Sequence, residues 1–250
     1  MRKVLLYFAL KYNGDYRKIL QAITDKEHVN VNELENVESK IKCNYITIID
    51  STYPIELKSI SSPPFVLFYY GDISLLNAAN KIAVIGKREC SLYGEEMTRK
   101  IVKQLKFYKV VTVSGMAKGI DSLAHQTSLE NKIKTIAVLG SGIAYCYPTN
   151  NTELYEKIKT TGLIISEYPG SLTPTPHNFL IRNRIIAGLS KSIVVIEANL
   201  KSGTINTVSF GLEFGKDIFA VPTLATANSG CNLLIKQGAK LIETASDIFE

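Results

Sequence analysis

From residue 81 to the end of the chain, short and nearly continuous apolar runs alternate with stretches of helical spacing. The apolar runs cover residues 82–85, 110–113, 135–139, 163–165, 193–196 and 218–221. Runs of this length are typical of strands buried on both faces, and their alternation with helices is typical of parallel crossover units. We therefore predict an α/β fold with a doubly wound, mostly parallel, Rossmann-like sheet.

The first part of the chain lacks this regularity. Residues 1–44 show short helical patterns and are too few to build a core of their own. Residues 45–80 hold two apolar stretches interrupted by prolines, which fits a leading segment before the regular part. We expect a small N-terminal helical region over residues 1–44, which docks on one extended domain over residues 45–250. The core of that domain is expected at residues 81–250.

The charge distribution points to an anionic partner for the regular part. Residues 1–80 carry nine lysines and arginines against nine acidic residues, whereas residues 81–250 carry twenty against fourteen. The whole excess behind the net charge of +6 therefore lies in the second segment. A basic segment favours nucleic acid or another anion as partner, although a lysine-rich, solubilising surface remains open on charge alone.

Loops rich in glycine, serine and cations follow several of the predicted strands. In an open α/β sheet, ligands bind beyond the carboxyl ends of the strands, where glycines let backbone N–H groups and helix N-termini face an anion. One such loop alone is weak evidence, because glycine often serves helix packing, but the loops converge on one edge of the sheet. We expect Asp121 to be the N-cap of a helix there. The residues assigned to this anion-binding rim are Gly86, Lys87, Arg88, Ser114, Gly115, Lys118, Gly119, Lys201, Ser202 and Gly203. A further glycine loop is expected at residues 140–142.

A segment near residue 180 adds an aromatic ring and two arginines, and we predict a helix over about residues 181–189. Phe179 can stack on a base, or it can be part of the core. Arg182 and Arg184 flank Asn183 and diverge by roughly 200° on a helix, so one can face the sheet edge while the other serves a neighbouring surface. The alternative for either arginine is a structural ion pair with Glu197 or Glu167. We assign Phe179, Arg182, Asn183 and Arg184 to the binding site.

Several classes of enzyme lack support in the sequence. There is no GxxxxGK[ST] loop, no GxGxxG turn and no nucleophile elbow, and Ser114 and Ser202 have no evident base, so we interpret them as phosphate contacts. The three histidines and four cysteines show no metal-ligand spacing. We expect no catalytic residues, no metal and no cofactor. No apolar run approaches the ~20 residues of a membrane helix, so we expect no membrane partner. The scattered cysteines and the lack of a signal-peptide pattern lead us to expect a cytoplasmic protein.

A series of motifs resembles the DNA-processing protein A (DprA/Smf) family over residues 45–250. The motifs are Gly86-Lys-Arg88, Ser114-Gly-Met-Ala-Lys-Gly-Ile-Asp121, Gly140-Ser-Gly142, Tyr147-Pro148, Ile165-Ser-Glu167, Phe179, Arg182-Asn-Arg184, Glu197-Ala198, Ser202-Gly203 and Phe219-Ala-Val-Pro222. The resemblance implies a homodimer that binds single-stranded DNA in a basic pocket, protects incoming DNA and helps to load a RecA-type recombinase in natural transformation. It implies no catalysis, and the winged-helix domain of some members is not expected at the C-terminus.

One alternative comes from a different class of function. The wider superfamily of Rossmann-like proteins includes phosphoribohydrolases, which are nucleotide-processing enzymes with a glutamate just behind a glycine loop. In this sequence the corresponding loop, residues 201–207, lacks that glutamate, and Glu197 precedes it. The sequence therefore favours the DNA-binding hypothesis and keeps the enzyme as the alternative.

Overall fold

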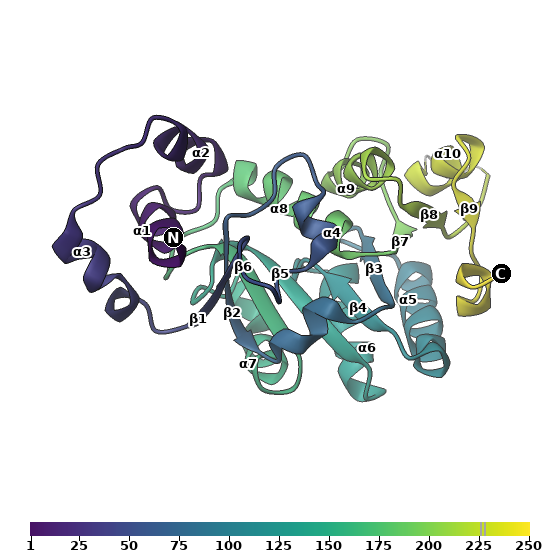
Figure 1. Ribbon diagram of the computed structural model, residues 1–250. Coiled ribbons are helices and arrows are strands. Elements are labelled where there is room, and N and C mark those ends of the chain that lie inside the picture. The colour runs from purple at the N-terminus through teal and green to yellow at the C-terminus, as the bar shows by residue number, and fades with distance from the viewer. Residues whose placement is uncertain (226, 228) are drawn as a thin grey trace.

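The computed structural model describes residues 1–225, 227 and 229–250. Through the described part of the chain runs a nine-stranded sheet in the order β1-β2-β6-β5-β4-β3-β7-β8-β9 (Figure 1). The strands are β1 (Asn44–Thr47), β2 (Val66–Gly71), β3 (Lys81–Gly86), β4 (Val111–Ser114), β5 (Lys134–Gly142), β6 (Leu163–Tyr168), β7 (Ser192–Glu197), β8 (Asp217–Ala220) and β9 (Lys240–Leu241). Strands β3 to β9 pair in parallel, while β1 and β2 extend the sheet in antiparallel fashion beside β6. The predicted doubly wound, mostly parallel α/β sheet is confirmed.

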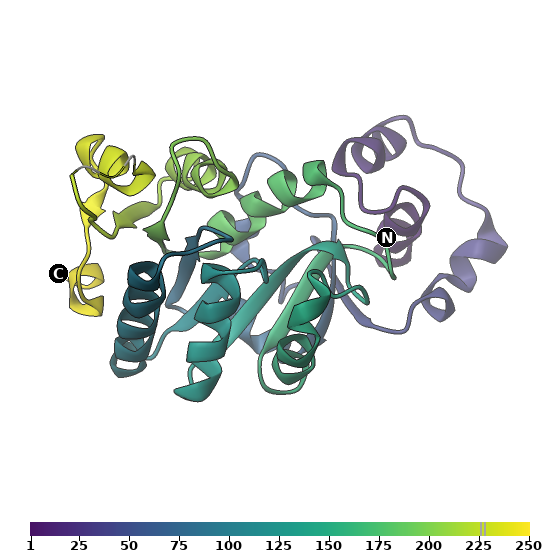
Figure 2. The same cartoon turned by 180° about the vertical axis from the view of Figure 1, so that it is seen from behind.

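Helices cover both faces of this sheet. The α-helices are α1 (Arg2–Lys11), α2 (Tyr16–Thr24), α3 (Val31–Glu35), α4 (Ile55–Lys58), α5 (Leu92–Leu105), α6 (Ile120–Glu130), α7 (Thr152–Thr161), α8 (Pro176–Leu189), α9 (Gly203–Glu213) and α10 (Gly230–Lys236). Short 3₁₀ helices lie at η1 (Val37–Lys40), η2 (Ile73–Asn77), η3 (Lys106–Tyr108), η4 (Thr149–Asn151) and η5 (Ala245–Ile248). Helices α5, α6 and α7 lie on one face, as Figure 2 shows, and α4, α8, α9 and α10 lie on the other.

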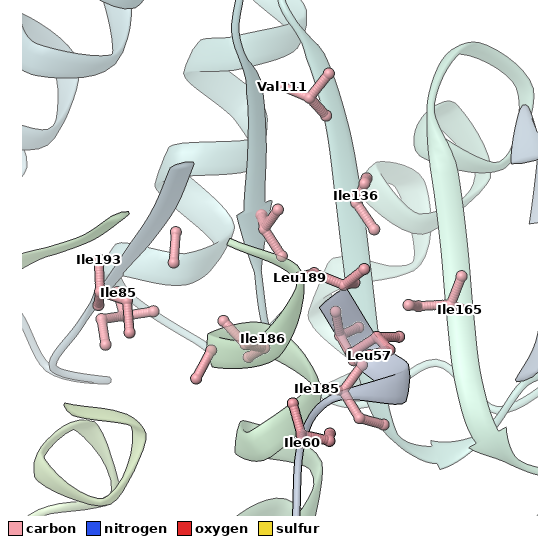
Figure 3. Close-up of a cluster of buried hydrophobic side chains, with 14 of the residues drawn as sticks. Leu57, Ile60, Ile85, Val111, Ile136, Ile165, Ile185, Ile186, Leu189 and Ile193 are labelled. Carbon is pink, nitrogen blue, oxygen red and sulfur yellow. The ribbon is translucent and has the colours of Figure 1, made fainter. Parts of the chain in front are cut away.

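The alternation of side chains along each strand explains the two layers. In β3, Ile82 and Val84 point to the face under α5 and α6, while Ala83 and Ile85 point to the face under α8. Because both sets are apolar and buried, the strand appears in the sequence as a continuous apolar run. Figure 3 shows Ile185, Ile186 and Leu189 of α8 packed among strand residues and against Leu57 and Ile60. Helix α8 is therefore held tightly over the middle of the sheet.

The N-terminal helices share a core with one end of the sheet. Leu6 and Phe8 of α1 pack in the same buried cluster as Phe68 of β2 and Ile164 of β6. Gly14, with φ of +75°, lies so close to β6 that a Cβ there would be 2.3 Å from the carbonyl oxygen of Glu167. These helices lie at the opposite end of the molecule from the C-terminus (Figure 1).

Two local predictions need correction. Residues 140–142, expected as a loop, belong to β5, whose pairing with β6 shifts in register between Leu139 and Gly142. Helix α8 begins at Pro176, five residues before the expected start at residue 181, because the Thr175 hydroxyl caps it by accepting the N–H of Asn178. None of the helices in the described residues has both the length and the apolar character needed to cross a membrane.

Candidate nucleic-acid interface

A cavity of about 850 Å³ lies beyond the carboxyl ends of β3 and β7. The chain order of the strands reverses between these two neighbours, since β4, β5 and β6 follow on one side and β8 and β9 on the other. Such a switch point is where doubly wound sheets bind their ligands. The cavity is lined by Ile85, Gly86, Lys87, Arg88, Glu89, Ala117, Asp121, Tyr147, Pro174, Pro176, Phe179, Leu180, Arg182, Asn183, Ile186, Asn199, Ser202, Gly203, Thr204 and Thr207.

The cavity gathers part of the predicted rim and leaves part of it outside. Among the predicted site residues, its lining includes Gly86, Lys87, Arg88, Phe179, Arg182, Asn183, Ser202 and Gly203. Its lining does not include Ser114, Gly115, Lys118, Gly119, Arg184 or Lys201. Lys118 and Lys201 are exposed on nearby loops, whereas Ser114, Gly115 and Arg184 are buried. The loops after β3 and β7 are therefore the part of the predicted rim that shapes the cavity.

Arg88 provides an available positive charge at the cavity. Its side chain is exposed, and within the described part of the chain it has no hydrogen-bond or ion-pair partner. The loop that carries it is fixed from below, since the N–H of Ile120 donates to the carbonyl oxygen of Lys87 at 3.1 Å. Gly119, with φ of +82°, permits this approach, because a Cβ there would be 2.4 Å from the carbonyl oxygen of Arg88. The guanidinium is thus presented by a supported loop.

Lys87, next to Arg88, is already paired. Its Nζ lies 3.0 Å from Oε1 of Glu197 at the end of β7. Oε2 of the same carboxylate accepts the backbone N–H of Ser91 at 2.9 Å. Partial burial opposes the charge on Glu197, but the hydrogen bonds from Ser91 and Lys87 outweigh it and hold the pKa below its usual value. Lys87 therefore contributes less free charge to the cavity than its sequence position suggests.

The loop after β4 satisfies its own donors. The N–H of Gly115 donates to the Asp121 carboxylate at 3.1 Å, which is where the sequence predicts an anionic ligand. The N-cap of α6 is Gly119, so the prediction that Asp121 caps this helix is wrong, and Asp121 lies in its first turn. Ser114 is fully buried and its hydroxyl donates to the carbonyl oxygen of Val84 at 2.8 Å, so the interpretation of this hydroxyl as a phosphate contact does not match its position.

The two arginines of α8 diverge as their spacing predicts. Arg182, 4% exposed, faces the sheet edge, where Nη1 donates to the carbonyl oxygens of Gly115, at 2.7 Å, and Val138. Burial lowers its pKa to about 10, although the Asp121 carboxylate nearby acts in the opposite direction. Because Nη1 is occupied by these two carbonyls and Nε donates to Oδ1 of Asn183 at 3.1 Å, Arg182 supports the cavity floor.

Arg184 belongs to a different surface. Its Nη2 donates to both carboxylate oxygens of Glu167, at 2.6 and 2.8 Å, and both side chains are buried. Of the two ion-pair partners that the sequence leaves open, Glu167 is therefore the one that Arg184 takes, and Glu197 pairs with Lys87. A buried, doubly hydrogen-bonded pair of this kind is a structural element, and Arg184 does not reach the cavity.

Phe179 gives the cavity a flat apolar surface. The ring lies against Gly140, where a Cβ would be only 2.6 Å from it, so glycine at this place lets the ring seat on the end of β5. The ring is partly exposed, and Arg88 and Arg182 lie 5.4 and 5.9 Å from its centroid. Tyr147, 43% exposed, adds a second ring at 5.6 Å with an interplanar angle of 37°. Tyr147 is not among the predicted site residues, although it belongs to the Tyr147-Pro148 motif.

The N-terminus of α9 forms another part of the cavity wall. Asn183 fixes this end by donating from Nδ2 to the carbonyl oxygen of Gly203 at 3.1 Å. The Thr204 hydroxyl donates to the carbonyl oxygen of Gly86 at 3.1 Å and so joins the loops after β3 and β7. No side chain in the described residues caps the first N–H groups of α9, and Ser202 and Gly203 line the cavity. Free N–H groups and the helix dipole favour an anion at such a helix end.

Taken together, the cavity can hold an anion and a flat ring at the same time. Arg88 and the α9 N-terminus supply hydrogen-bond donors that do not act as a general acid or base. Phe179 and Tyr147 supply ring faces. Within residues 1–225, 227 and 229–250, no three histidine, cysteine, aspartate or glutamate side chains gather as a metal site requires. The arrangement suits a polyanion with planar bases.

Comparison with known proteins supports this chemistry. Residues 44–250 match the family model described as DNA recombination-mediator protein A. The chain is 41% identical to the DNA processing protein DprA of Streptococcus pneumoniae over 204 residues, which cover 81% of the chain and 72% of that protein. It is 40% identical to the DNA processing protein DprA of Bacillus subtilis over 209 residues, or 83% of the chain and 70% of that protein.

Two solved structures extend the comparison to the fold. The crystal structure of DprA from Streptococcus pneumoniae superposes with a TM-score of 0.82 at 35% identity, over 99% of this chain and 92% of that one. The structure of DNA processing protein A from Helicobacter pylori, described for its single-stranded DNA binding mode, superposes with a TM-score of 0.74 at 30% identity. That match covers 84% of this chain and 95% of the Helicobacter chain.

Proposed function

Since this chain belongs to the DNA recombination-mediator protein A family, we propose that it binds single-stranded DNA in the cavity between β3 and β7. The observation that carries the proposal is the position of the Arg88 guanidinium over the Phe179 ring at that cavity, where it has no hydrogen-bond or ion-pair partner in the described part of the chain. Charge for the backbone and a ring face for a base are thereby combined in one place. The Helicobacter relative, described for its binding of single-stranded DNA, supports the same assignment.

The phosphate is held from two sides in this proposal. Arg88 offers a planar fork of N–H donors that suits a phosphate oxygen pair. The end of α9, which no side chain caps among the described residues, offers the backbone N–H groups of Gly203 and Thr204. Neither contact distinguishes one base from another, because both address the backbone. Binding is therefore expected with little dependence on sequence.

The aromatic pair favours a single strand over a duplex. A base can lie on Phe179 or Tyr147 only when its face is not covered by a neighbouring base pair. In a duplex the bases are stacked on each other, so the contribution from these rings is lost while the phosphate contact remains. The preference for single strands is thus expected to come from stacking.

We further propose that the protein acts as a mediator in the cytoplasm. In this role it protects incoming DNA in natural transformation and helps to load a RecA-type recombinase, and it forms a homodimer through the C-terminal end of the sheet. The support for the dimer is an apolar hollow of about 430 Å³ beside β9, whose lining includes Leu233, Ile235 and Leu241. Leu233 and Leu241 are 39% and 47% exposed, which is unusual for neighbouring leucines unless a partner covers them.

The alternative function, a nucleotide-processing enzyme, depends on Glu197 as the residue that would take a proton from water. In this structure both oxygens of that carboxylate have donors, since Lys87 holds one and Ser91 the other. A glutamate engaged in this way is not poised to take a proton from water, which favours the binding function. Release of a base from a nucleoside monophosphate by the protein, abolished in Glu197→Gln, would support the enzyme.

The experiment that tests the proposed function is a titration with single-stranded and duplex oligonucleotides of equal length at several salt concentrations. We expect the single strand to bind more tightly, with an affinity that falls as salt rises. Equal or tighter binding of the duplex at matched salt would contradict the proposal.

A further inference from the structure

One of the protein's own carboxylates occupies the place where a doubly wound fold usually binds a phosphate. Helix α5 follows β3, the first strand at the switch point, and its N-terminus is the expected anion site. Glu197 reaches this helix end from β7, and its Oε2 accepts the Ser91 backbone N–H at 2.9 Å and the Ser91 hydroxyl at 3.1 Å. The other oxygen, Oε1, lies 3.0 Å from Nζ of Lys87.

The local sequence is built to admit this carboxylate. A Cβ on Gly94, in the first turn of α5, would lie 2.4 Å from Oε2 of Glu197, so a larger residue would push the carboxylate out. The two partners of the ion pair are 27% and 20% exposed, which leaves Lys87 in contact with the cavity. The pKa of Glu197 lies below its usual value, so the carboxylate is charged at neutral pH and acts as a permanent anion.

The pair separates two hollows. Lys87 lines the large cavity that also contains Arg88 and Phe179, and together with Glu197 it lines a second hollow of about 170 Å³ behind it. A lysine at this boundary can turn its ammonium group toward either side, because its four-carbon stem is flexible. An ion pair that is partly open to water is held less firmly than a fully buried one, so an arriving phosphate can displace the carboxylate.

We propose that Glu197 is an internal anion that competes with the phosphates of a bound strand for Lys87. The inference rests on the proposed single-strand binding and adds a specificity residue to it. In the free protein Lys87 is neutralised, and each binding event exchanges the carboxylate for a backbone phosphate. The affinity of the cavity for a strand is therefore lower than it would be if Lys87 and Arg88 were both free to bind phosphate.

The same arrangement disfavours small phosphorylated ligands. The end of α5 is filled by Glu197, and the loop before α6 is filled by Asp121, which accepts the N–H of Gly115. A free nucleotide depends on one compact phosphate site. The end of α5 and the loop before α6 are such sites, and each is already occupied by a carboxylate. A strand has several phosphates and bases, so its contacts with Arg88, the end of α9 and the aromatic rings add to the phosphate that displaces Glu197 from Lys87.

The test uses Glu197→Gln with Glu89→Gln as the matched control. The glutamine oxygen can still accept from Ser91, so the helix end stays capped, but the competing charge is gone. Glu89 is an exposed carboxylate that lines the same cavity and has no ion-pair partner among the described residues. We expect Glu197→Gln to bind an oligothymidylate roughly two- to fivefold more tightly, with a salt slope steeper by up to about 0.7, and Glu89→Gln to show a smaller gain.

Three results would overturn the proposal. The first is unchanged or weaker binding by Glu197→Gln, and the second is an equal gain in Glu89→Gln, which would show only a general effect of charge. The third is a double variant, Lys87→Met/Glu197→Gln, that still binds more tightly than Lys87→Met alone by the same factor, because no lysine is left there to be released. Lys87→Met alone serves if Glu197→Gln does not fold. It should weaken binding less than Arg88→Met, and an equal or larger loss would contradict the competition.

A second measurement keeps this inference separate from the proposed function. The melting temperature of each variant is followed with and without inorganic pyrophosphate. We expect pyrophosphate to stabilise Glu197→Gln more than the parent protein and Glu89→Gln, because only the first adds Lys87 and the end of α5 to the donors that Arg88 and α9 already offer. If the parent protein fails to bind oligonucleotides, the proposed function is wrong, and the pyrophosphate result still decides whether Glu197 blocks the site at Lys87.

Discussion

The guanidinium of Arg88 lies 5.4 Å from the centre of the Phe179 ring. The two residues are far apart in the sequence, one in the loop after β3 and the other in the first turn of α8. A guanidinium over a ring face is attracted by the π electrons, and this attraction positions both groups before any ligand arrives. The cation for a phosphate and the surface for a base are therefore linked, and each can be tested by its own variant.

Removal of the Arg88 charge should weaken binding to every single strand to a similar extent. We expect Arg88→Ala to lower the affinity about tenfold and to reduce the salt slope by about 0.7, because one phosphate contact is lost. The measurement is a salt series of binding titrations together with the melting temperature. Arg99→Ala is the control, since Arg99 is exposed on α5, outside the cavity, and pairs only loosely with Glu130 at 3.8 Å. Unchanged affinity in Arg88→Ala, or a lost fold, would show that Arg88 is no phosphate contact.

Removal of the Phe179 ring should weaken binding without changing its salt dependence. We expect Phe179→Leu to lose about 1–3 kcal/mol of binding free energy, the range for one stacked base, while leucine still covers Gly140. The salt slope should stay near that of the parent protein, which distinguishes this variant from Arg88→Ala. A slope that falls together with the affinity would mean that Phe179 acts only by holding Arg88.

His125 should make the folded protein sensitive to acid. It is buried on α6, its Nδ1 lies 2.7 Å from the Thr135 hydroxyl, and burial lowers its pKa to about 3. In the unfolded chain this pKa returns to about 6.5, so between these values the unfolded state binds the extra proton and stability falls as the pH falls. Between about pH 7 and about pH 5, His125 should account for about 2 kcal/mol of the loss. Urea denaturation at about pH 7 and about pH 5 should show a smaller loss of unfolding free energy for His125→Gln than for the parent protein. Equal losses in the two proteins would refute this.

The apolar hollow beside β9 should mediate the dimer. Light scattering at micromolar concentration is expected to give twice the chain mass for the parent protein and a shift toward the monomer for Leu233→Glu, because a charge cannot be buried in an apolar contact. Leu92→Glu is the control, since Leu92 is 85% exposed on α5 and does not line that hollow. A monomeric parent protein with intact DNA binding would contradict the expected dimer.

The sheet and its ligand-binding edge were predictable from local patterns. Continuous apolar runs identified the parallel strands, and the glycines at the ends of β3 and before α9 marked the loops that frame the cavity. These signals are short-range, because burial on both faces of a strand and a tight turn after it each leave a mark within a few residues. The divergence of Arg182 and Arg184 followed in the same way from helical geometry.

The partner of each cation was not predictable. Arg88, Arg182 and Lys87 were all assigned to the binding site from the sequence. Among the described residues Arg88 has no hydrogen-bond or ion-pair partner, whereas Arg182 donates to the carbonyl oxygens of Gly115 and Val138 and Lys87 pairs with Glu197. The partner that each cation takes depends on contacts between residues more than 40 positions apart in the sequence, and no local pattern carries that information. The antiparallel position of β2 beside β6 was missed for the same reason.

The hydrogen bond from Thr204 to the carbonyl oxygen of Gly86 has a consequence for the thermodynamics of binding. It ties the two walls of the cavity across the switch point, so the walls cannot open and close independently as hinged lobes do. The protein then loses little conformational entropy when a strand arrives, and the ordering falls mainly on the strand. An oligothymidylate whose sugar–phosphate backbone is chemically locked should therefore bind with a smaller entropic penalty than the flexible parent strand, and calorimetry of the two strands should show this difference.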